Sequence, residues 1–487
     1  MTAGSPRLPH TFFVPPARVL TALVATLILG GCVGFTPDGG MSPAVEVAAS
    51  RLHQEVVKIG SDDDARTAQD QAAKLLARPL TAGHAVQVAF LRNRDLQASF
   101  NELGVSEAEY VKASLPPEPS FNLNQLAGMG DVEVVSQVAV GLFALATLPA
   151  RQEIASEKFQ AAQWRTAGDV MALAADVSRQ YYTTVAAQDQ DTFLGTAVAG
   201  AQASADLARQ LGEAGNINKL QQAREGSLYV ELGAQLADAR LQAKAERERL
   251  TRLMGLWGHD IAFKLPKSLP PLPKRITTER DVEATALRER FDLRAARHDL
   301  DALARQLGLT NATRYVTDVS LAFQNDTERA APSSNGSNLI RNGAVLDFTI
   351  PIYDFGESKV RNARETYMAA ANRLAQRAIN ARSQAREAYA RYRGKYDLAR
   401  YYAERVVPLQ TTIFEQSSLE TNGMLSDVTQ LILDSRLRST NNIAAIVAKR
   451  DYFLAAVDLK AALTGNGPAA SSAAPRPPAT GMAQAAN

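Results

Sequence analysis

The chain has 487 residues, of which 21% are charged, and this suits a folded protein with several domains. Its 53 Lys and Arg residues nearly balance its 51 Asp and Glu residues, so the concentrated basic surface of a nucleic-acid-binding protein is not expected. Aromatic residues amount to only 6%, and Ala, Gln, Leu and Arg are abundant, which favours long helices. The single cysteine excludes intrachain disulfide bonds, and the five histidines are too scattered to predict a histidine metal site.

Residues 1–31 have the organisation of a lipoprotein signal peptide. An uncharged apolar run at 19–29 is too short to span a bilayer, but it suits the hydrophobic region of a signal peptide. The sequence Leu-Gly-Gly-Cys follows, ends at Cys32 and resembles the bacterial lipobox, in which the cysteine thiol takes a diacylglycerol. We therefore predict acylation at Cys32 and a lipid-anchored segment at 32–81. The alternative is an ordinary signal peptide in which Cys32 is incidental.

Two similar halves follow one another along the chain. An offset of 208 residues places Tyr181 on Tyr389, and further upstream an offset of 197 places Leu103 on Leu300. An offset that stays constant over about 70 residues is typical of an internal duplication. We predict a first repeat at 82–263, a Pro-rich linker at 264–280, a second repeat at 281–464 and a disordered tail at 465–487.

Each repeat is predicted to begin with a helix, at 82–113 and at 281–310, and to continue with two strands. Apolar residues alternate with small or polar ones at 319–323, which indicates a strand with one apolar face. The polar segment 325–342 is expected to be the loop of the second hairpin. Each strand can extend to the length that a tilted transmembrane strand needs, and the alternative is a small soluble sheet packed on helices. Alternation also predicts strands at 121–124, 137–142 and 346–350.

Long helices are predicted after the strands, at 151–210 and 357–420, each followed by a return helix, at 217–255 and 425–464. A helix of about 60 residues is about 90 Å long, so it needs partner helices along its whole length, including helices from other subunits. Gly215 and Gly423 lie at the reversals, where glycine can take a positive φ. The coiled-coil-like stripes are Thr166, Val170, Leu173, Val177, Tyr181 and Val185 in the first helix, and Ala363, Ala370, Leu374, Ala381, Ala385, Tyr389 and Tyr392 in the second.

This order of elements resembles the TolC-like outer-membrane efflux channels, the outer membrane factor family. Ile-Pro-Ile-Tyr-Asp-Phe-Gly at 350–356 is similar to the family's junction between strand and helix, and Asn-Gly-Met-Leu-Ser-Asp-Val at 422–428 is similar to its second periplasmic hairpin tip. The stretches 85–96 and 113–120 resemble its first helix and the lead into its first strand. The first tip departs from the pattern, since Lys219 stands where the second copy has Asp427.

The resemblance implies a fold that is mainly α with a transmembrane β part. In a homotrimer, four strands from each chain would close a 12-stranded β-barrel, and the long helices would continue it as an α-helical barrel across the periplasm. It implies a lipid-anchored protein of the bacterial outer membrane that is the passive exit duct of a tripartite efflux system for small molecules or metal ions. A periplasmic adaptor (membrane fusion) protein would connect it to an inner-membrane transporter, which the resemblance suggests is proton-driven.

Two other functions stay open, a channel for type I protein secretion and an envelope scaffold lipoprotein that transports nothing. The sequence predicts no enzymatic activity and no cofactor, and it contains no phosphate-binding loop motif. In a trimer, Asp427 would form a ring of three carboxylates and is the candidate pore gate. The alternative is that Asp427 stabilises the start of the return helix, at the positive end of its dipole. The candidates for the hairpin tips and the adaptor contact are Gly215, Asn216, Asn218, Asn422, Gly423 and Ser426.

Overall fold

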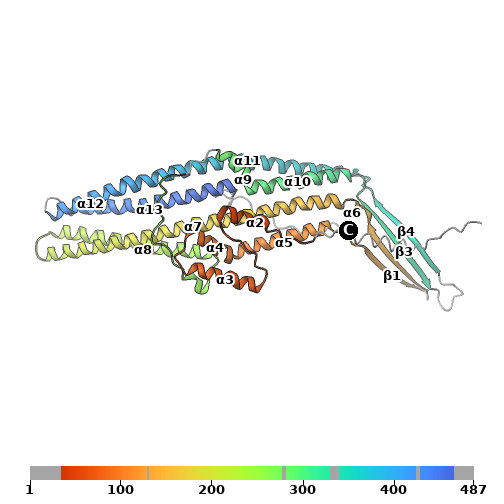
Figure 1. Cartoon of the computed structure of the whole chain (residues 1–487), viewed down its shortest axis with the longest axis horizontal. Helices are drawn as coiled ribbons and strands as arrows, with labels where there is room; N and C mark the ends of the chain where they lie inside the picture. Colours follow the sequence, from red (N-terminus) through yellow and green to blue (C-terminus); the bar gives the residue numbers. More distant parts are fainter. Residues whose placement is uncertain (1–33, 129–130, 277–280, 330–338, 424–427, 466–487) are drawn as a thin grey trace, which may run out of the picture.

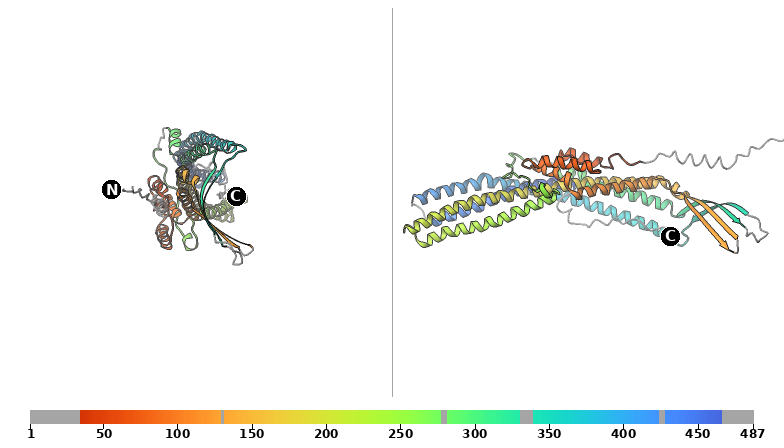
Figure 2. Two further views of the ribbon diagram at one scale, coloured as in Figure 1. Left: turned by 90° about the vertical axis from the view of Figure 1, so that its right-hand side faces the viewer. Right: turned by 90° about the horizontal axis from the view of Figure 1, so that it is seen from below.

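The chain forms an elongated bundle of helices with a small sheet at one end (Figure 1). The structure is a computed structural model that describes residues 34–128, 131–276, 281–329, 339–423 and 428–465. Two long helical hairpins run side by side, and their turns lie at the end of the molecule opposite the sheet (Figures 1 and 2). The first half contains α2 (Ser42–Val47), the π-helix η1 (Ala48–Leu52), α3 (Asp62–Leu76), α4 (Ala82–Arg92), α5 (Arg94–Ser114), β1 (Ser120–Gly128), β2 (Asp131–Gly141), α6 (Leu142–Ala146), α7 (Leu148–Glu213), α8 (Lys219–Leu253) and the 3-10 helix η2 (Gly258–Ile261). The second half contains α9 (Val282–Glu289), α10 (Phe291–Ala312), β3 (Asp318–Arg329), β4 (Leu339–Thr349), α11 (Glu357–Tyr401), the π-helix η3 (Tyr402–Val406), α12 (Val407–Asn422) and α13 (Val428–Thr464).

The predicted first helix of each half is broken near its start. Asn93 and Arg290 have extended backbone and separate α4 from α5 and α9 from α10. Asn93 caps α5 by accepting a hydrogen bond from the Leu96 N–H, and its Nδ2 donates to the Leu253 carbonyl at 2.9 Å. Arg290 is buried and donates to the Ala462 carbonyl at 3.2 Å. Each break is therefore stabilised by a hydrogen bond to the last turns of a return helix, a long-range contact that local periodicity does not reveal.

The strands follow the prediction in number and position but not in extent. Leu142 begins α6 and Ile350 lies beyond β4, so neither belongs to a strand. The predicted loop 325–342 is too long, because β3 and β4 extend into it from both sides. An Arg341–Glu328 ion pair of 3.2 Å helps to keep these polar segments paired as strands. Residues 330–338 of that predicted loop lie outside the described residues.

Long helices run where the sequence predicts them, and their apolar stripes are buried or partly buried. At about 1.5 Å per residue, the 66 residues of α7 extend about 100 Å. The second long helix is not continuous, since the π-helix η3 separates α11 from α12, with Pro408 in the first turn of α12. Pro408 has no N–H to donate and fixes its own φ, which favours a change of helix geometry at this point.

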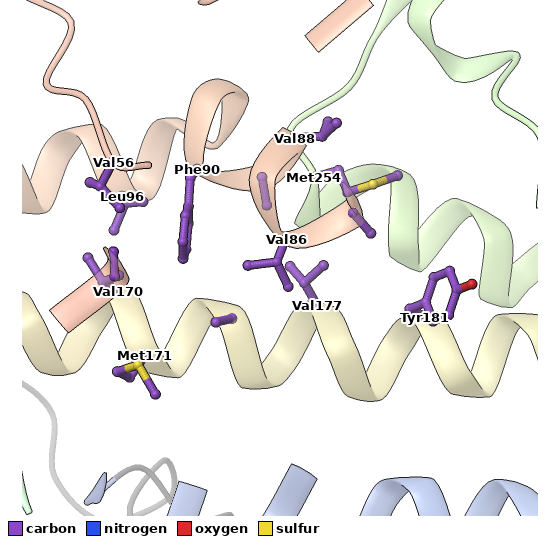
Figure 3. Close-up of a cluster of buried hydrophobic side chains, with 14 of the residues drawn as sticks. Val56, Val86, Val88, Phe90, Leu96, Val170, Met171, Val177, Tyr181 and Met254 are labelled. Carbon is purple, nitrogen blue, oxygen red and sulfur yellow. The ribbon is translucent and has the colours of Figure 1, made fainter. Parts of the chain in front are cut away.

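The main hydrophobic core lies halfway along the molecule. Figure 3 shows α4 and the start of α5 packed over α7, with Phe90 and Val86 facing the α7 side chains Val170 and Val177. Met254, after the end of α8, completes this cluster. A second core of aromatic residues joins α11 to α13, where the rings of Tyr392 and Tyr452 lie 5.7 Å apart.

The segment before the first repeat is folded against this middle region (Figure 1). Its helix α3 begins at Asp62, and Ser61 and Asp64 form a capping box there, so the acidic triplet at 62–64 belongs to a helix N-terminus. The hydrogen bond from the Ser61 hydroxyl lowers the pKa of Asp64.

Candidate channel-forming site

The sheet has one apolar and one polar face. Its strands are antiparallel in the order β1-β2-β3-β4, and residues paired across strands share a face. Most apolar side chains are solvent-exposed in the single chain, for example Phe121 at 74% and Phe348 at 62%. The apolar face carries Val319, Phe348, Val140, Leu321, Leu346, Phe121, Val138, Phe323, Ala344, Leu123, Val134 and Ile340. The other face is mainly polar and carries Ser320, Asp347, Asn122, Gln137, Gln324, Asn124, Asp326, Arg341, Glu133 and Glu328, together with the apolar Leu126, Val135, Leu339 and Val345.

Polar groups on the sheet are paired with one another. On the polar face, Arg341 lies 3.5 Å from the Asp326 carboxylate and also contacts Glu328. The apolar face also carries polar residues, among them Gln125 and Thr327, and in one row the Asn325 amide donates to Asn342 at 2.7 Å. Because a buried or lipid-facing polar group costs free energy unless it is hydrogen-bonded, this pairing makes the row compatible with an apolar surrounding.

An exposed apolar belt follows β4 at the base of the sheet, next to the helices. Its members follow β4, and Tyr353 is 99% exposed. Isolated apolar residues on a surface are ordinary, but a contiguous group beside an apolar sheet indicates contact with lipid or with another protein. The belt consists of Ile350, Ile352, Tyr353 and Phe355.

A sharp turn connects this belt to α11. Gly356 has φ +74, and a Cβ there would lie 2.4 Å from the Arg314 carbonyl oxygen, so only glycine fits. Asp354 accepts hydrogen bonds from the backbone N–H of Gly356 at 2.9 Å and of Ser358 at 3.2 Å. The hydrogen bond from the Ser358 hydroxyl lowers the pKa of Asp354. This is the junction motif at 350–356 that the sequence analysis singled out.

The first hairpin tip is well defined. Gly215 has φ +78 and ends α7 with two turn hydrogen bonds, from its own N–H to Gly212 and from the Asn216 N–H to the Leu211 carbonyl. Asn218 caps α8 and forms a capping box with Gln221, so its side chain already has a structural role. Asn216 is exposed and is the remaining candidate for contact with a partner.

The second tip is described only in part. Asn422 is the last residue of α12, and Gly423 follows with φ −82, so the expected positive φ at Gly423 is wrong. The Gly423 N–H donates to the Leu419 carbonyl and simply continues the helical pattern. Asp427 and Ser426 lie outside the described residues. The end of α12 lies at the same end of the molecule as the first tip (Figure 1), and Arg224 of α8 contacts the Thr429 hydroxyl of α13 at 2.5 Å.

The two hairpins differ in what they bury near the tips. Between α7 and α8, a leucine-rich cluster includes Leu194, Leu228 and Leu232. In the second hairpin, Ser417 and Ser439 are buried, and neither hydroxyl has a hydrogen-bond partner among the described residues. Several leucines of that hairpin point outward instead: Leu409, Leu419, Leu433 and Leu437. This pattern is typical of a surface that packs against further helices.

Comparison with known proteins agrees with this arrangement. Residues 284–417 match the family model described as outer membrane efflux protein. The fold matches CusC, from a study of transmembrane channel formation, with a TM-score of 0.67 and 15% identity over 81% of this chain and 92% of CusC. It also matches the outer-membrane channel OprN, with a TM-score of 0.67 and 17% identity over 87% and 96% of the two chains. The CmeC outer membrane channel of Campylobacter jejuni matches with a TM-score of 0.64 and 16% identity over 87% and 92%.

Residues 284–417 therefore match the outer membrane efflux protein family, and the chain shares the fold of the outer-membrane channels CusC, OprN and CmeC. No curated protein sequence matches the chain.

Within the residues that the structure describes, no helix combines sufficient length with sufficient hydropathy to cross a bilayer.

The predicted acylation site, Cys32, lies outside the described residues, but Thr36, four positions later, is held in place. The Thr36 backbone N–H and hydroxyl both donate to Glu107 Oε1 at 2.5 Å. The Glu107 side chain is buried on α5, which leads into β1. Sequence analysis missed this contact, because a polar pair 71 residues apart leaves no local pattern.

Proposed function

We propose that this protein is the exit duct of a tripartite efflux system in the bacterial outer membrane. The observation that carries the proposal is the amphipathic sheet, whose outer strands β1 and β4 have no partner along one side in the described part of the chain. An open sheet edge cannot face lipid, because its backbone N–H and C=O groups would have no hydrogen-bond partners. Three copies with four strands each would close a 12-stranded barrel and remove the edges.

The dimensions of the sheet support membrane insertion. From Ile350 to Ile340 the chain extends about 33 Å at about 3.3 Å per residue. A strand tilt of about 40° reduces the height to about 25 Å, the height of the apolar band of transmembrane barrels. The apolar face would then contact lipid, the polar face would line a water-filled lumen, and Tyr353 would lie at the inner interface.

In the proposed trimer, the helices continue the lumen across the periplasm as an α-helical barrel. The outward leucines of the second hairpin would pack against helices of the neighbouring subunit. The repeats at 82–263 and 281–464 are proposed to derive from a duplication, with 264–280 as the linker. Two observations support this, the same succession of helix pair, strand pair and helical hairpin in both halves, and the equivalent breaks at Asn93 and Arg290.

The remaining parts of the proposal concern attachment and partners. Cys32 would carry the lipid anchor, and the Thr36–Glu107 contact supports a fixed departure point for it. Asn216, Asn218, Asn422 and Ser426 would lie where a periplasmic adaptor docks, which would connect the duct to a proton-driven inner-membrane transporter. Asp427 is proposed as the gate. The buried hydroxyls of Ser417 and Ser439 have no hydrogen-bond partner among the described residues, and such weak packing near the tip supports a tip that can move.

Conductance of purified trimers in a planar bilayer tests the duct. We expect discrete single-channel currents, and a larger conductance for Asp427→Ala, because the substitution removes three carboxylates from the constriction. Asp62→Ala, in the capped helix α3, is the matched control and should conduct like the parent. Absence of current in both the parent and Asp427→Ala would contradict the duct and favour the scaffold role.

A further inference from the structure

We propose that the contact between α7 and α10 contains a site for a divalent transition metal ion that links the first half of the chain to the second. The ligands are Glu157 on α7 and His298 and Asp301 on α10. One carboxylate oxygen or ring nitrogen from each residue lies within 4.8 Å of those of the other two. The site is independent of the proposed transport role and of the hairpin tips.

The secondary structure brings the three groups together. His298 and Asp301 are three residues apart on α10, so they lie on the same face of that helix. Glu157 reaches them from the neighbouring helix, and its Oε2 lies 2.8 Å from His298 Nδ1. Zinc–ligand bonds of about 2.0 Å in tetrahedral geometry place ligand atoms about 3.3 Å apart. An increase of about half an ångström in the distance between His298 Nδ1 and Glu157 Oε2 would therefore make room for the ion.

Arg305 positions the carboxylate of Glu157. Its guanidinium donates to Glu157 Oε1 at 3.2 Å, while Oε2 faces the histidine, so the two oxygens have separate partners. Hydrogen bonds of this kind orient ligating carboxylates in metal sites. Arg305 also pairs with Glu153, so the one guanidinium is shared between Glu153 and Glu157, and the Asp301 carboxylate adds a third negative charge to the cluster. This excess of negative charge favours a cation.

Asp301 is the group that distinguishes a metal site from an ordinary ion pair. Its side chain is exposed, and it forms neither a hydrogen bond nor an ion pair with any residue that the structure describes. The Glu157–His298 contact needs no third partner, whereas a metal ion does. One imidazole and two carboxylates suit Zn²⁺ or Co²⁺, with water at the remaining positions, and the lack of sulfur ligands argues against Cu(I).

The sequence analysis predicted no histidine metal site, because the five histidines are scattered along the chain. That criterion does not apply to a site with one histidine and carboxylates from two helices. The His-x-x-Asp spacing at 298–301 was a visible signal, but Glu157 is 141 residues away and only the fold supplies it.

Titration calorimetry of the purified full-length protein with ZnCl₂ tests the proposal. We expect one zinc ion per chain, and tetrahedral d–d absorption bands when Co²⁺ replaces Zn²⁺. Asp301→Asn should bind zinc at least about tenfold more weakly. It should also leave the metal-free melting temperature unchanged, because Asp301 has no partner to lose. His259→Ala, which removes an exposed histidine elsewhere, is the matched control and should bind like the parent.

Two results would overturn the metal site. One is the absence of zinc binding by the parent at about 1 mM zinc, the weak end of ordinary affinities. The other is an unchanged zinc affinity in both Asp301→Asn and His298→Ala. His298→Ala also breaks the contact with Glu157 and can lower the metal-free melting temperature, so Asp301→Asn is the deciding variant.

Discussion

At the scale of single residues, Glu225 is the least expected side chain in the helical hairpins. It is buried on α8, one turn before Leu228, on the stripe that continues through Leu232 and Leu236 and packs against α7. Burial raises the pKa of Glu225 above its ordinary value of 4.5, because the apolar surroundings disfavour the carboxylate. A leucine stripe that ends in a carboxyl group stabilises the hairpin less near its tip than in its middle.

Glu225→Gln should therefore stabilise the protein near neutral pH by about 1 kcal/mol. As the pH rises from 4.5, the unfolded chain loses its Glu225 proton before the folded chain does, so the parent loses stability until the pH passes the folded-state pKa. Above that pKa the stability difference between the parent and the variant no longer changes with pH. Below pH 4.5 the parent and the variant should be equally stable, and melting temperatures between pH 4 and 8 measure the difference. Glu248→Gln, an exposed position on the same helix, is the control; a difference that does not depend on pH would contradict this account.

At the scale of elements, the strands show what alternation can and cannot predict. The period of two located all four strands and their apolar faces, because the faces of a sheet repeat every second residue. It did not predict that β3 and β4 extend into the polar segment 325–342, since pairing between Asp326, Glu328 and Arg341 stabilises polar strands across the sheet. The helix breaks at Asn93 and Arg290 were missed for the same reason, as their hydrogen-bond partners lie more than 150 residues away.

The two faces of the sheet predict opposite responses to the same charge. Leu346→Arg places a guanidinium on the apolar face, where transfer to lipid near the membrane centre costs about 2–4 kcal/mol. Asn122→Arg places it on the polar face, and we expect no loss of stability there. Folding into phospholipid vesicles over a range of urea concentrations measures both free energies. Equal effects of the two substitutions would show that the apolar face does not contact lipid.

At the scale of the whole molecule, the single chain leaves surfaces that three-fold assembly would cover. In the described part of the chain the sheet has open outer strands, and the second hairpin exposes several leucines and buries two hydroxyls that have no hydrogen-bond partner. The sequence predicted long helices that need partners along their length, because their stripes are too long for a compact domain. It could not define the tips, where Gly423 takes an ordinary negative φ and Asn218 serves as a helix cap.

Disulfide crosslinking between β1 and β4 can establish how many copies close the sheet. Leu123 on β1 shares the apolar face with Ala344, Leu346 and Phe348 on β4, so a cysteine at 123 combined with one at 344, 346 or 348 should meet its counterpart in the next subunit. In one of these three registers, we expect mild oxidation of the membrane-inserted protein to give a covalent ladder on denaturing gels that ends at the trimer. The matched control pairs position 123 with Val345, which faces the other side of the sheet and should crosslink poorly. A ladder that ends at the dimer, or equal crosslinking through 345, would contradict a three-fold barrel. A ladder that ends at the trimer would show that the strands of neighbouring copies satisfy the open edges, as the bilayer requires.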